Sequence, residues 1–390
     1  MQIIIVELKN EIGSLAQLII NSYSLNILEI SDVSDNKGSA DSITLKLVSK
    51  NILTNKAIFQ NFELADMMHV IRVERVNNLT FSSSDDLKIN QFSGLLLISD
   101  TVSEELFTII IKTALNFGLS FSSSAVCSNR ENSQNCLVIR IVFTGCVTDR
   151  MNFQIKLLEI EEQFSVDICF EDQEFKVSDF SLIVFDMDST LINCEVIDEL
   201  AREVNMQNEV AKITESAMRG ELDFGESLHQ RLSLLKGAPS SILSKVLDAI
   251  DYNPGAKRLI SKLQSLGYKT AIISGGFSFF TEHIKNSLSI DYAFANVLEI
   301  SNGILTGKIE NCPLDGKMKN SLMKKLAVDL NIDLRRVIAV GDGANDIPMI
   351  SNSGLGIAFR AKPKVSEASK YAIKIGGLDT ILYFLGIKDD

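Results

Sequence analysis

The sequence lacks three features that would each indicate a class of protein: paired cysteines, a long apolar run and an excess of basic residues. Its six cysteines form no C-x-x-C pair and no histidine cluster accompanies them, so we expect reduced thiols and neither a zinc site nor a disulfide framework. No run approaches the roughly 20 apolar residues of a membrane span, so no membrane partner is expected. Lys and Arg number 38 against 50 Asp and Glu, a net charge of -12 that argues against a nucleic-acid partner.

The beginning of the sequence also lacks the basic stretch of a signal peptide. Met1 to Glu7 is apolar but reaches an acid by the seventh residue, which is typical of a strand. We therefore expect a cytoplasmic location. The 390 residues, 46% of them hydrophobic, provide enough material for two or three domains.

Two stretches with little apolar periodicity divide the chain. Residues 78–91 contain the polar run Ser82 to Asp86, and a shorter break covers residues 171–178. The expected domains are therefore about 1–78, about 91–172 and about 181–390.

The first two segments repeat one order of elements, β-α-β-β-α-β, which is the ferredoxin-like α+β unit. A sheet of this kind buries one face, so such units often pair within a chain or between chains. The expected strands are 3–8, 26–33, 42–48 and 68–73 in the first segment and 94–98, 120–126, 137–144 and 166–170 in the second. The expected helices are 15–23, 56–62, 103–115 and 150–164.

The third segment alternates short apolar strands with amphipathic stretches. Leu182–Phe185, Thr270–Ser274 and Val337–Val340 are the clearest strands. This alternation predicts an α/β fold with a parallel sheet covered on both faces. Ligands of such sheets bind beyond the carboxyl ends of the strands, where the polar motifs of this segment occur.

The first motif is a pair of carboxylates, Asp186 and Asp188, directly after an apolar strand. Taken alone, it is equally compatible with a turn. The chemical interpretation is that Asp186 attacks phosphorus as a nucleophile and Asp188 protonates the leaving alkoxide. A neighbouring negative charge favours the protonated acid that this step needs.

The second motif, Gly341 to Asp346, again places carboxylates after a strand and adds glycines that permit a tight turn. Asp342 and Asp346, brought near Asp186, would make an oxygen-rich site of the kind that magnesium prefers. As an isolated heptapeptide the motif remains compatible with an ordinary turn.

Two further elements suit phosphate binding. Ser274-Gly275-Gly276 joins a strand to a helix, so its hydroxyl and N–H groups could hold phosphoryl oxygens. Lys317 precedes a predicted helix between the Ser-Gly-Gly and Gly-Asp-Gly motifs, where a buried ammonium would offset negative charge. A strand-to-helix turn and a surface lysine are the alternatives.

Together and in this order, the four elements make residues 181–390 resemble the haloacid dehalogenase-like phosphatases. The resemblance implies a Rossmann-like core with a cap inserted at about 193–252. It also implies Asp186 as nucleophile, Asp188 as acid and base, and Mg²⁺ held by Asp186, the Asp188 carbonyl and Asp342. Family members that pump ions carry D-K-T-G-T instead, so Asp188 favours a hydrolase.

Within this family the segment resembles the phosphoserine phosphatases. The matching residues include Asp186 to Glu195, Met218 to Phe224, Arg231 to Leu235 and Val340 to Asp346, with Asn345 among the phosphate-binding positions. Phosphoserine carries an ammonium and a carboxylate besides its phosphate, which Glu195 and Arg231 are suited to bind. The resemblance places Met218 and Phe224 as apolar cover; a solvated ion pair and core packing are the alternatives.

The first 172 residues resemble tandem ACT-like domains. Gly13 lies in the turn where such domains often bind an amino acid, and the second copy has no glycine there. This implies a homodimer with L-serine as an effector near Gly13; modules that only assemble the protein are the alternative.

Two other functions are the alternatives, and the first would use the same catalytic residues. One is a phosphotransferase that passes the phosphoryl group from Asp186 to an alcohol. The other is an amino-acid sensor with a vestigial phosphatase domain, which the intact set Asp186, Asp188, Ser274, Lys317 and Asp342 argues against.

Overall fold

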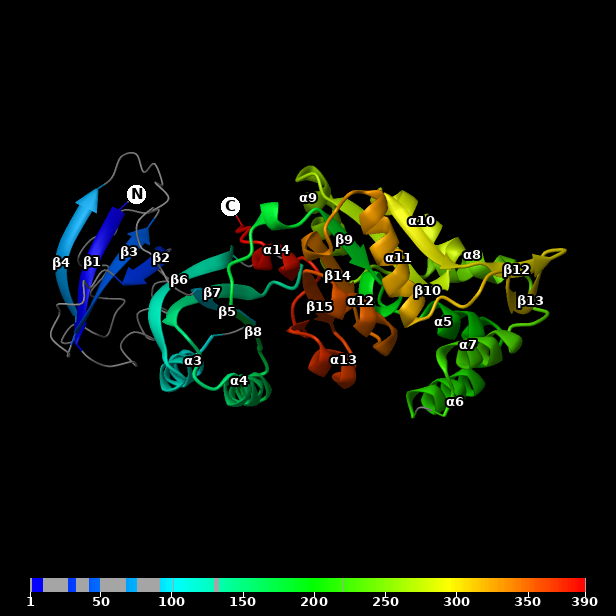
Figure 1. Ribbon diagram of the computed structural model, residues 1–390, viewed down its shortest axis with the longest axis horizontal. Coiled ribbons are helices and arrows are strands. Elements are labelled where there is room, and N and C mark those ends of the chain that lie inside the picture. Colours follow the sequence, from blue (N-terminus) through cyan, green and yellow to red (C-terminus); the bar gives the residue numbers. More distant parts are fainter. Residues whose placement is uncertain are drawn as a thin grey trace. The chain divides into compact units, whose positions relative to one another are not determined.

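The computed structural model describes residues 92–389 except 101, 130–132 and 220, together with four strands of the first 91 residues. The chain divides into two units (Figure 1). Unit 1 comprises Met1–Phe175 and Leu382–Asp390, and unit 2 comprises Lys176–Ile381.

The second half of unit 1 has the β-α-β-β-α-β order that its sequence predicts. Its elements are β5 (Phe92–Ser99), α3 (Glu104–Asn116), β6 (Leu119–Asn129), β7 (Leu137–Gly145), α4 (Arg150–Phe164) and β8 (Asp167–Glu171). The strands pair antiparallel in the order β6-β7-β5-β8. Alternate residues of β5, such as Leu95 and Leu97, pack with Phe107 of α3 and Phe153 of α4 in one core.

The first half of unit 1 contributes four described strands to the same sheet. They are β1 (Gln2–Lys9), β2 (Ile27–Asp32), β3 (Ser42–Ser49) and β4 (Met68–Arg75), paired in the order β4-β1-β3-β2. Strand β2 pairs antiparallel with β6, so both strand sets form one eight-stranded sheet. The helices predicted at 15–23 and 56–62 lie outside the described residues.

Unit 2 is built on a six-stranded parallel sheet in the order β11-β10-β9-β14-β15-β16. The strands are β9 (Leu182–Phe185), β10 (Lys269–Phe277), β11 (Tyr292–Asn296), β14 (Val337–Gly341), β15 (Leu355–Phe359) and β16 (Tyr371–Ile373). The predicted strands β9, β10 and β14 lie next to one another, and every residue of β9 is fully buried. The parallel α/β core that the alternating pattern predicts is therefore confirmed.

Helices connect these strands and pack on the sheet. They are α9 (Ala256–Ser265), α10 (Ser278–Leu288), α11 (Gly316–Asp329), α12 (Ile347–Asn352) and α13 (Pro363–Ala368). A last short helix, α14 (Thr380–Phe384), follows β16 near the end of the chain. Leu182 and Val184 of β9 share one core cluster with Met323 and Leu326 of α11. Over the described parts of the chain, no helix is both long and apolar enough to span a membrane.

Four helices are inserted between β9 and α9 and form the cap. They are α5 (Val196–Glu203), α6 (Gln207–Met218), α7 (Phe224–Ser233) and α8 (Ser241–Asp248). A bridge between Ile192 and Tyr252 closes the base of the insertion. The loop between α7 and α8 bonds to a hairpin of β12 (Leu298–Ser301) and β13 (Ile304–Ile309), with Leu305 N donating to Ala238 O at 2.9 Å.

Candidate active site

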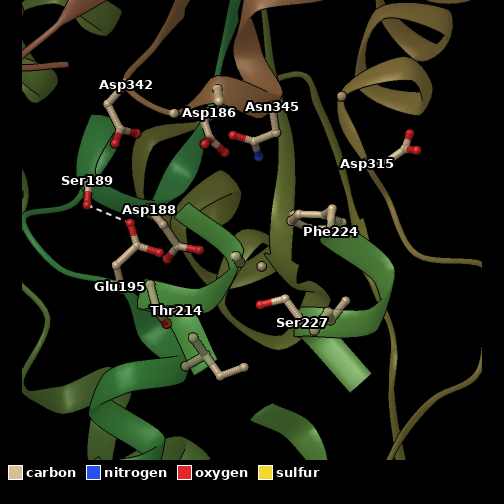
Figure 2. Close-up of a pocket in the computed structure, with 18 of the residues that line it drawn as sticks. Asp186, Asp188, Ser189, Glu195, Thr214, Phe224, Ser227, Asp315, Asp342 and Asn345 are labelled. Atoms are coloured by element: carbon tan, nitrogen blue, oxygen red, sulfur yellow. Dashed lines mark hydrogen bonds between the residues drawn. The ribbon is translucent and has the colours of Figure 1, made fainter. Parts of the chain in front are cut away.

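The carboxyl ends of two adjacent strands bring the acids of the two motifs together. Asp186 follows β9 and Asp342 follows β14, and these parallel strands pair Phe185 with Val340. Asp186 is 5% exposed and Asp342 is 4% exposed. In the close-up of the pocket, both side chains and Asn345 point into the same space (Figure 2).

A buried ammonium lies among these acids, and it belongs to Lys319. Its Nζ lies 2.8 Å from Asp186 Oδ1 and 2.7 Å from Asp346 Oδ1. Lys319 is fully buried, whereas Lys317 is exposed, although it also lines the pocket. The assignment of the buried cation to Lys317 is therefore wrong by two residues.

The phase of helix α11 explains this difference. Asp315 caps the helix, with its side chain accepting a hydrogen bond from Met318 N at 2.8 Å. Two residues along a helix rotate a side chain by about 200°. Lys319 therefore shares the buried face of Met323 and Leu326, at spacings of four and seven residues, and Lys317 faces outward.

Asp346 is held by groups of the chain on both of its oxygens. Oδ1 accepts from Lys319 Nζ, and Oδ2 accepts from the backbone N–H groups of Asp342 at 3.2 Å and Gly343 at 2.9 Å. A Cβ on Gly341 would lie 2.4 Å from Asp346 Cγ, so glycine is required there. Asp346 thus fixes both Lys319 and the loop that carries Asp342.

The acids repel one another strongly. Burial, with the charges of Asp186 and Asp346, raises the pKa of Asp342 to about 8. Burial and Asp186 also raise the pKa of Asp346 to about 7, against the opposing effect of Lys319. Burial alone would lower the pKa of Lys319, but Asp186 and Asp346 raise it above its ordinary value.

This donor set fits a hard divalent cation. Oxygen atoms of Asp186, Asp342 and Asp346 lie within 4.8 Å of one another, and all three residues are buried. Three ionised carboxylates and one ammonium leave two negative charges, which a dication would neutralise. Carboxylate oxygens are also the ligands that Mg²⁺ prefers.

Asp188 lies where the core meets the cap. Its Oδ1 accepts a hydrogen bond from Val196 N, the first residue of α5, at 3.2 Å. Burial, then Glu195 and Asp186, raises its pKa well above the ordinary value. A Cβ on Gly276 would lie 2.6 Å from Asp188 Oδ2, so the second glycine of the Ser-Gly-Gly motif permits this approach.

The Ser-Gly-Gly motif forms the end of β10 beside these acids. Ser274 is fully buried, and its hydroxyl accepts from Gly276 N at 2.9 Å. Buried Asn296 donates to Gly275 O at 2.8 Å and accepts from Leu314 N at 3.0 Å. Asn296 therefore ties this loop to the segment that begins α11.

The acids open into a cavity of about 720 Å³ between core and cap. Glu195, Phe224, Arg231, Gly275 and Asn345 line it, together with Asp186, Asp188 and Asp342. Ser189 Oγ donates to Glu195 Oε1 at 2.9 Å, the contact dashed in Figure 2.

Helix α7 carries two of the predicted cap residues. Phe224 begins the helix, and a Cβ on Gly275 would lie 2.9 Å from its ring. Arg231 lies in the last turn, and its Nε donates to Ser227 O at 3.3 Å. Burial lowers the pKa of Arg231, while Glu195 and Asp198 oppose that effect.

The positions of two predicted site groups, the side chain of Met218 and the residue Gly13, are not described. Met218 ends α6, but its side chain lies outside the described residues, and so does the whole of Gly13.

The chain is similar to known hydrolases over this unit and beyond it. A haloacid dehalogenase-like hydrolase family matches residues 180–354. The phosphoserine phosphatase of Polaromonas sp. is 46% identical over 230 residues, covering 57% of this chain and 97% of that protein. The chain therefore belongs to the haloacid dehalogenase-like hydrolase family.

Solved structures agree with this membership. A probable phosphoserine phosphatase from Vibrio cholerae has a TM-score of 0.61 at 32% identity, covering 75% of this chain and 86% of that one. A phospho-aspartyl intermediate analogue of phosphoserine phosphatase has a TM-score of 0.50 at 43% identity, covering 53% of this chain and 99% of that one.

Proposed function

We infer that this enzyme is a phosphatase that hydrolyses O-phospho-L-serine to L-serine and phosphate, the last step of serine biosynthesis. The observation that carries the inference is a single cavity lined by two chemically different sets of groups. The first set is Asp186, which is paired with buried Lys319, and the second set is Glu195 and Arg231. A phosphate, an ammonium and a carboxylate on one small molecule match these groups.

The proposed first step is attack by Asp186 on phosphorus. A bond forms between a carboxylate oxygen and phosphorus while the bond from phosphorus to the serine oxygen breaks. Lys319 holds the Asp186 carboxylate in position and offsets the charge that gathers on the phosphoryl group. The similar phosphoserine phosphatase described as a phospho-aspartyl intermediate analogue supports this route.

Asp188 is the proposed acid and base. It donates its proton to the departing serine oxygen, and its raised pKa supports the protonated state that this requires. In the second step it accepts a proton from water as the water oxygen bonds to phosphorus. The bond to Asp186 then breaks, which releases phosphate and restores the free carboxylate.

Asp186, Asp342 and the Asp188 carbonyl would hold Mg²⁺ in the proposed metal site. Asp346 completes the acidic cluster and orients Asp342 through the backbone bonds of its loop. When bound, Mg²⁺ would supply positive charge to the phosphoryl oxygens. The donor set and its two excess negative charges support this assignment.

The remaining predicted residues are proposed to bind either the phosphoryl group or the serine part of the substrate. Ser274, the Gly275 N–H and Asn345 are proposed to hold phosphoryl oxygens. Glu195 is proposed for the ammonium and Arg231 for the carboxylate. Phe224, with Met218, would cover the bound molecule, and the close approach of Phe224 to Gly275 supports a narrow entrance.

The direct test is phosphate release from L-phosphoserine by the full chain. We expect turnover with Mg²⁺ and loss of turnover when EDTA removes it, restored by excess Mg²⁺. An Asp186→Asn variant that melts normally should be inactive, because an amide is not a nucleophile toward phosphorus. Turnover by that variant would contradict the covalent mechanism.

For unit 1 we propose two ACT-like modules that assemble a cytoplasmic homodimer and bind L-serine near Gly13. The strand order β4-β1-β3-β2 repeats as β8-β5-β7-β6, which supports a tandem pair. Because serine is also the product, calorimetry should use the full chain with Arg231→Ala, which removes the proposed carboxylate partner and so weakens serine binding at the active site. Serine binding that Gly13→Val removes is the expected result; no binding would leave assembly as the only role.

A further inference from the structure

Three oxygen atoms in the cap are buried without a hydrogen-bond partner among the described residues. They are Asp198 Oδ1, Thr214 Oγ1 and Ser227 Oγ. The three residues come from helices α5, α6 and α7, and all of them line the active-site cavity. Buried polar atoms in folded proteins are nearly always paired. Because these atoms share the wall of one cavity, a bound molecule is the natural partner.

Ser227 is the most deeply buried of the three, at 2% exposed. Serines within helices often donate to the carbonyl four residues back, as Ser321 does to Lys317 O at 2.9 Å. Ser227 makes no such bond, since the Asp223 carbonyl accepts only its backbone N–H, at 3.0 Å. In Figure 2 its hydroxyl points into the cavity, toward the side that carries Glu195 and Thr214.

The neighbour of Ser227 on helix α7 decides which ligand group it faces. Arg231 lies four residues on, so the two side chains share a face of the helix. The Arg231 Nε bonds to the Ser227 carbonyl at 3.3 Å, which brings the guanidinium back alongside Ser227. A hydroxyl can serve an ammonium or a carboxylate, but beside a guanidinium the complementary group is a carboxylate.

We propose that Ser227 donates a hydrogen bond to the carboxylate of the substrate beside Arg231, and so selects phosphate esters that carry a carboxylate. This inference rests on the proposed phosphatase function and adds a specificity residue to it. Asp198 and Thr214 lie on the facing helices, where their oxygens suit the ammonium at the other end of the amino acid.

The test compares Ser227→Ala with the unmodified enzyme on four phosphate esters. Phosphoserine carries both groups, phosphoglycolate only the carboxylate, phosphoethanolamine only the ammonium, and p-nitrophenyl phosphate neither. We expect kcat/KM to fall about 10- to 100-fold on the first two, as for a lost hydrogen bond to a charged group. It should change by less than about 3-fold on the last two.

Two variants guard against a purely structural effect. Ser227→Cys keeps a side chain of similar volume but donates a weaker hydrogen bond. It should therefore lower kcat/KM on the same two esters, by a smaller factor than Ser227→Ala. The control is Ser233→Ala on the same helix, where an exposed hydroxyl donates to Gln230 O at 2.7 Å. That variant should leave all four substrates unchanged. Where an ester is turned over too slowly, its inhibition constant replaces kcat/KM.

The outcomes separate the two proposals. An equal loss on all four esters would show that Ser227 only supports the cap. A loss on phosphoethanolamine without a loss on phosphoglycolate would assign the hydroxyl to the ammonium. Either result would overturn the role proposed for Ser227 and leave the proposed phosphatase function standing. Failure of the unmodified enzyme to cleave phosphoserine, with p-nitrophenyl phosphate still cleaved, would instead overturn the proposed function.

Discussion

At the residue scale, the buried ammonium of Lys319 offsets the negative charge of the acidic cluster, so that an anionic phosphate can bind beside it. It lies within 2.8 Å of Asp186 and 2.7 Å of Asp346, and no part of it is exposed. Its ammonium contacts two of the three neighbouring carboxylates that an incoming phosphate would face. Lys319 therefore both stabilises the cluster and prepares it for an anion.

Replacing this lysine provides the sharpest test of its role. Lys319→Met should lower kcat about 100- to 1000-fold, because a preorganised charge at the reacting group is lost. Lys317→Met is the matched control, two residues away on the exposed face, and should change kcat by less than about 3-fold. Phosphate release under saturating substrate measures both. A larger loss in Lys317→Met than in Lys319→Met would return the catalytic cation to Lys317.

The sequence contained a signal for Lys319 that motif spacing alone does not use. Lys319, Met323 and Leu326 follow the spacing of a buried helix face, while Lys317 is followed at the same interval by polar Ser321. A lysine on an apolar face needs a buried partner. Ser227 lacked any comparable signal, because only the cap's folded arrangement shows that its hydroxyl has no partner.

At the scale of elements, the turn after β9 is held in place by one amide. Ser189 has a φ of 55°, an uncommon conformation for a serine. Asn253, which is 5% exposed and follows the cap, directs its Nδ2 toward the carbonyls of Ser189, Thr190 and Ile192 at 2.9–3.0 Å. The residue that ends the insertion therefore also fixes the loop that carries Asp188.

Removing this amide should loosen the catalytic loop and the cap together. Asn253→Ala leaves buried carbonyls without a donor, so we expect about 2–4 kcal/mol of lost stability. It should also lower kcat/KM for phosphoserine at low temperature, where the variant is still folded, because the loop that carries Asp188 is no longer held in place. Chemical denaturation and kinetics on the same sample measure both. Asn193→Ala, an exposed asparagine at the same base of the cap, should be neutral; equal effects in the two variants would contradict this role.

The strands that position the site could be predicted well from the sequence. Leu182 to Phe185 was predicted as a strand with those bounds, because a short, continuous apolar run that ends in acids is typical of a buried parallel strand. The links between loops could not be predicted. Asn296 joins the Ser-Gly-Gly loop to Leu314 through two hydrogen bonds, and neither partner is a neighbour in the sequence.

At the scale of the whole molecule, the two units were predictable to different degrees. The sequence predicted strands at 3–8, 26–33, 42–48 and 68–73, and each of them overlaps one of the described strands β1 to β4. The order of these strands in the sheet could not be predicted, because it depends on pairing between segments far apart in the sequence. Each catalytic motif of unit 2 is a short contiguous segment, so it can be recognised from the sequence alone. The selectivity that we propose for the cavity instead depends on side chains from three cap helices, α5, α6 and α7, and their convergence cannot be read from any one segment of the sequence.

The acidic cluster also links the stability of the molecule to pH and to metal. The pKa of Asp342 rises from an ordinary value of 3.8 to about 8 in the folded chain, chiefly through burial and then through Asp186. Between these two values the folded chain binds more protons than the unfolded chain. Stability therefore falls as pH rises through this range, by up to about 1.4 kcal/mol per pH unit for one such group.

We therefore expect the melting temperature of the full chain in EDTA to fall between about pH 5 and about pH 8. Saturating Mg²⁺ should remove this decline, because the cation stabilises the ionised carboxylates and competes with their protons. The stabilisation by Mg²⁺ should accordingly be largest near pH 8. Asp342→Asn is the matched variant: it removes the titrating group, so its profile in EDTA should be flatter and its response to Mg²⁺ weaker. A melting temperature in EDTA that rises with pH, or an equal Mg²⁺ effect at every pH, would contradict a cluster that exchanges protons for a metal ion.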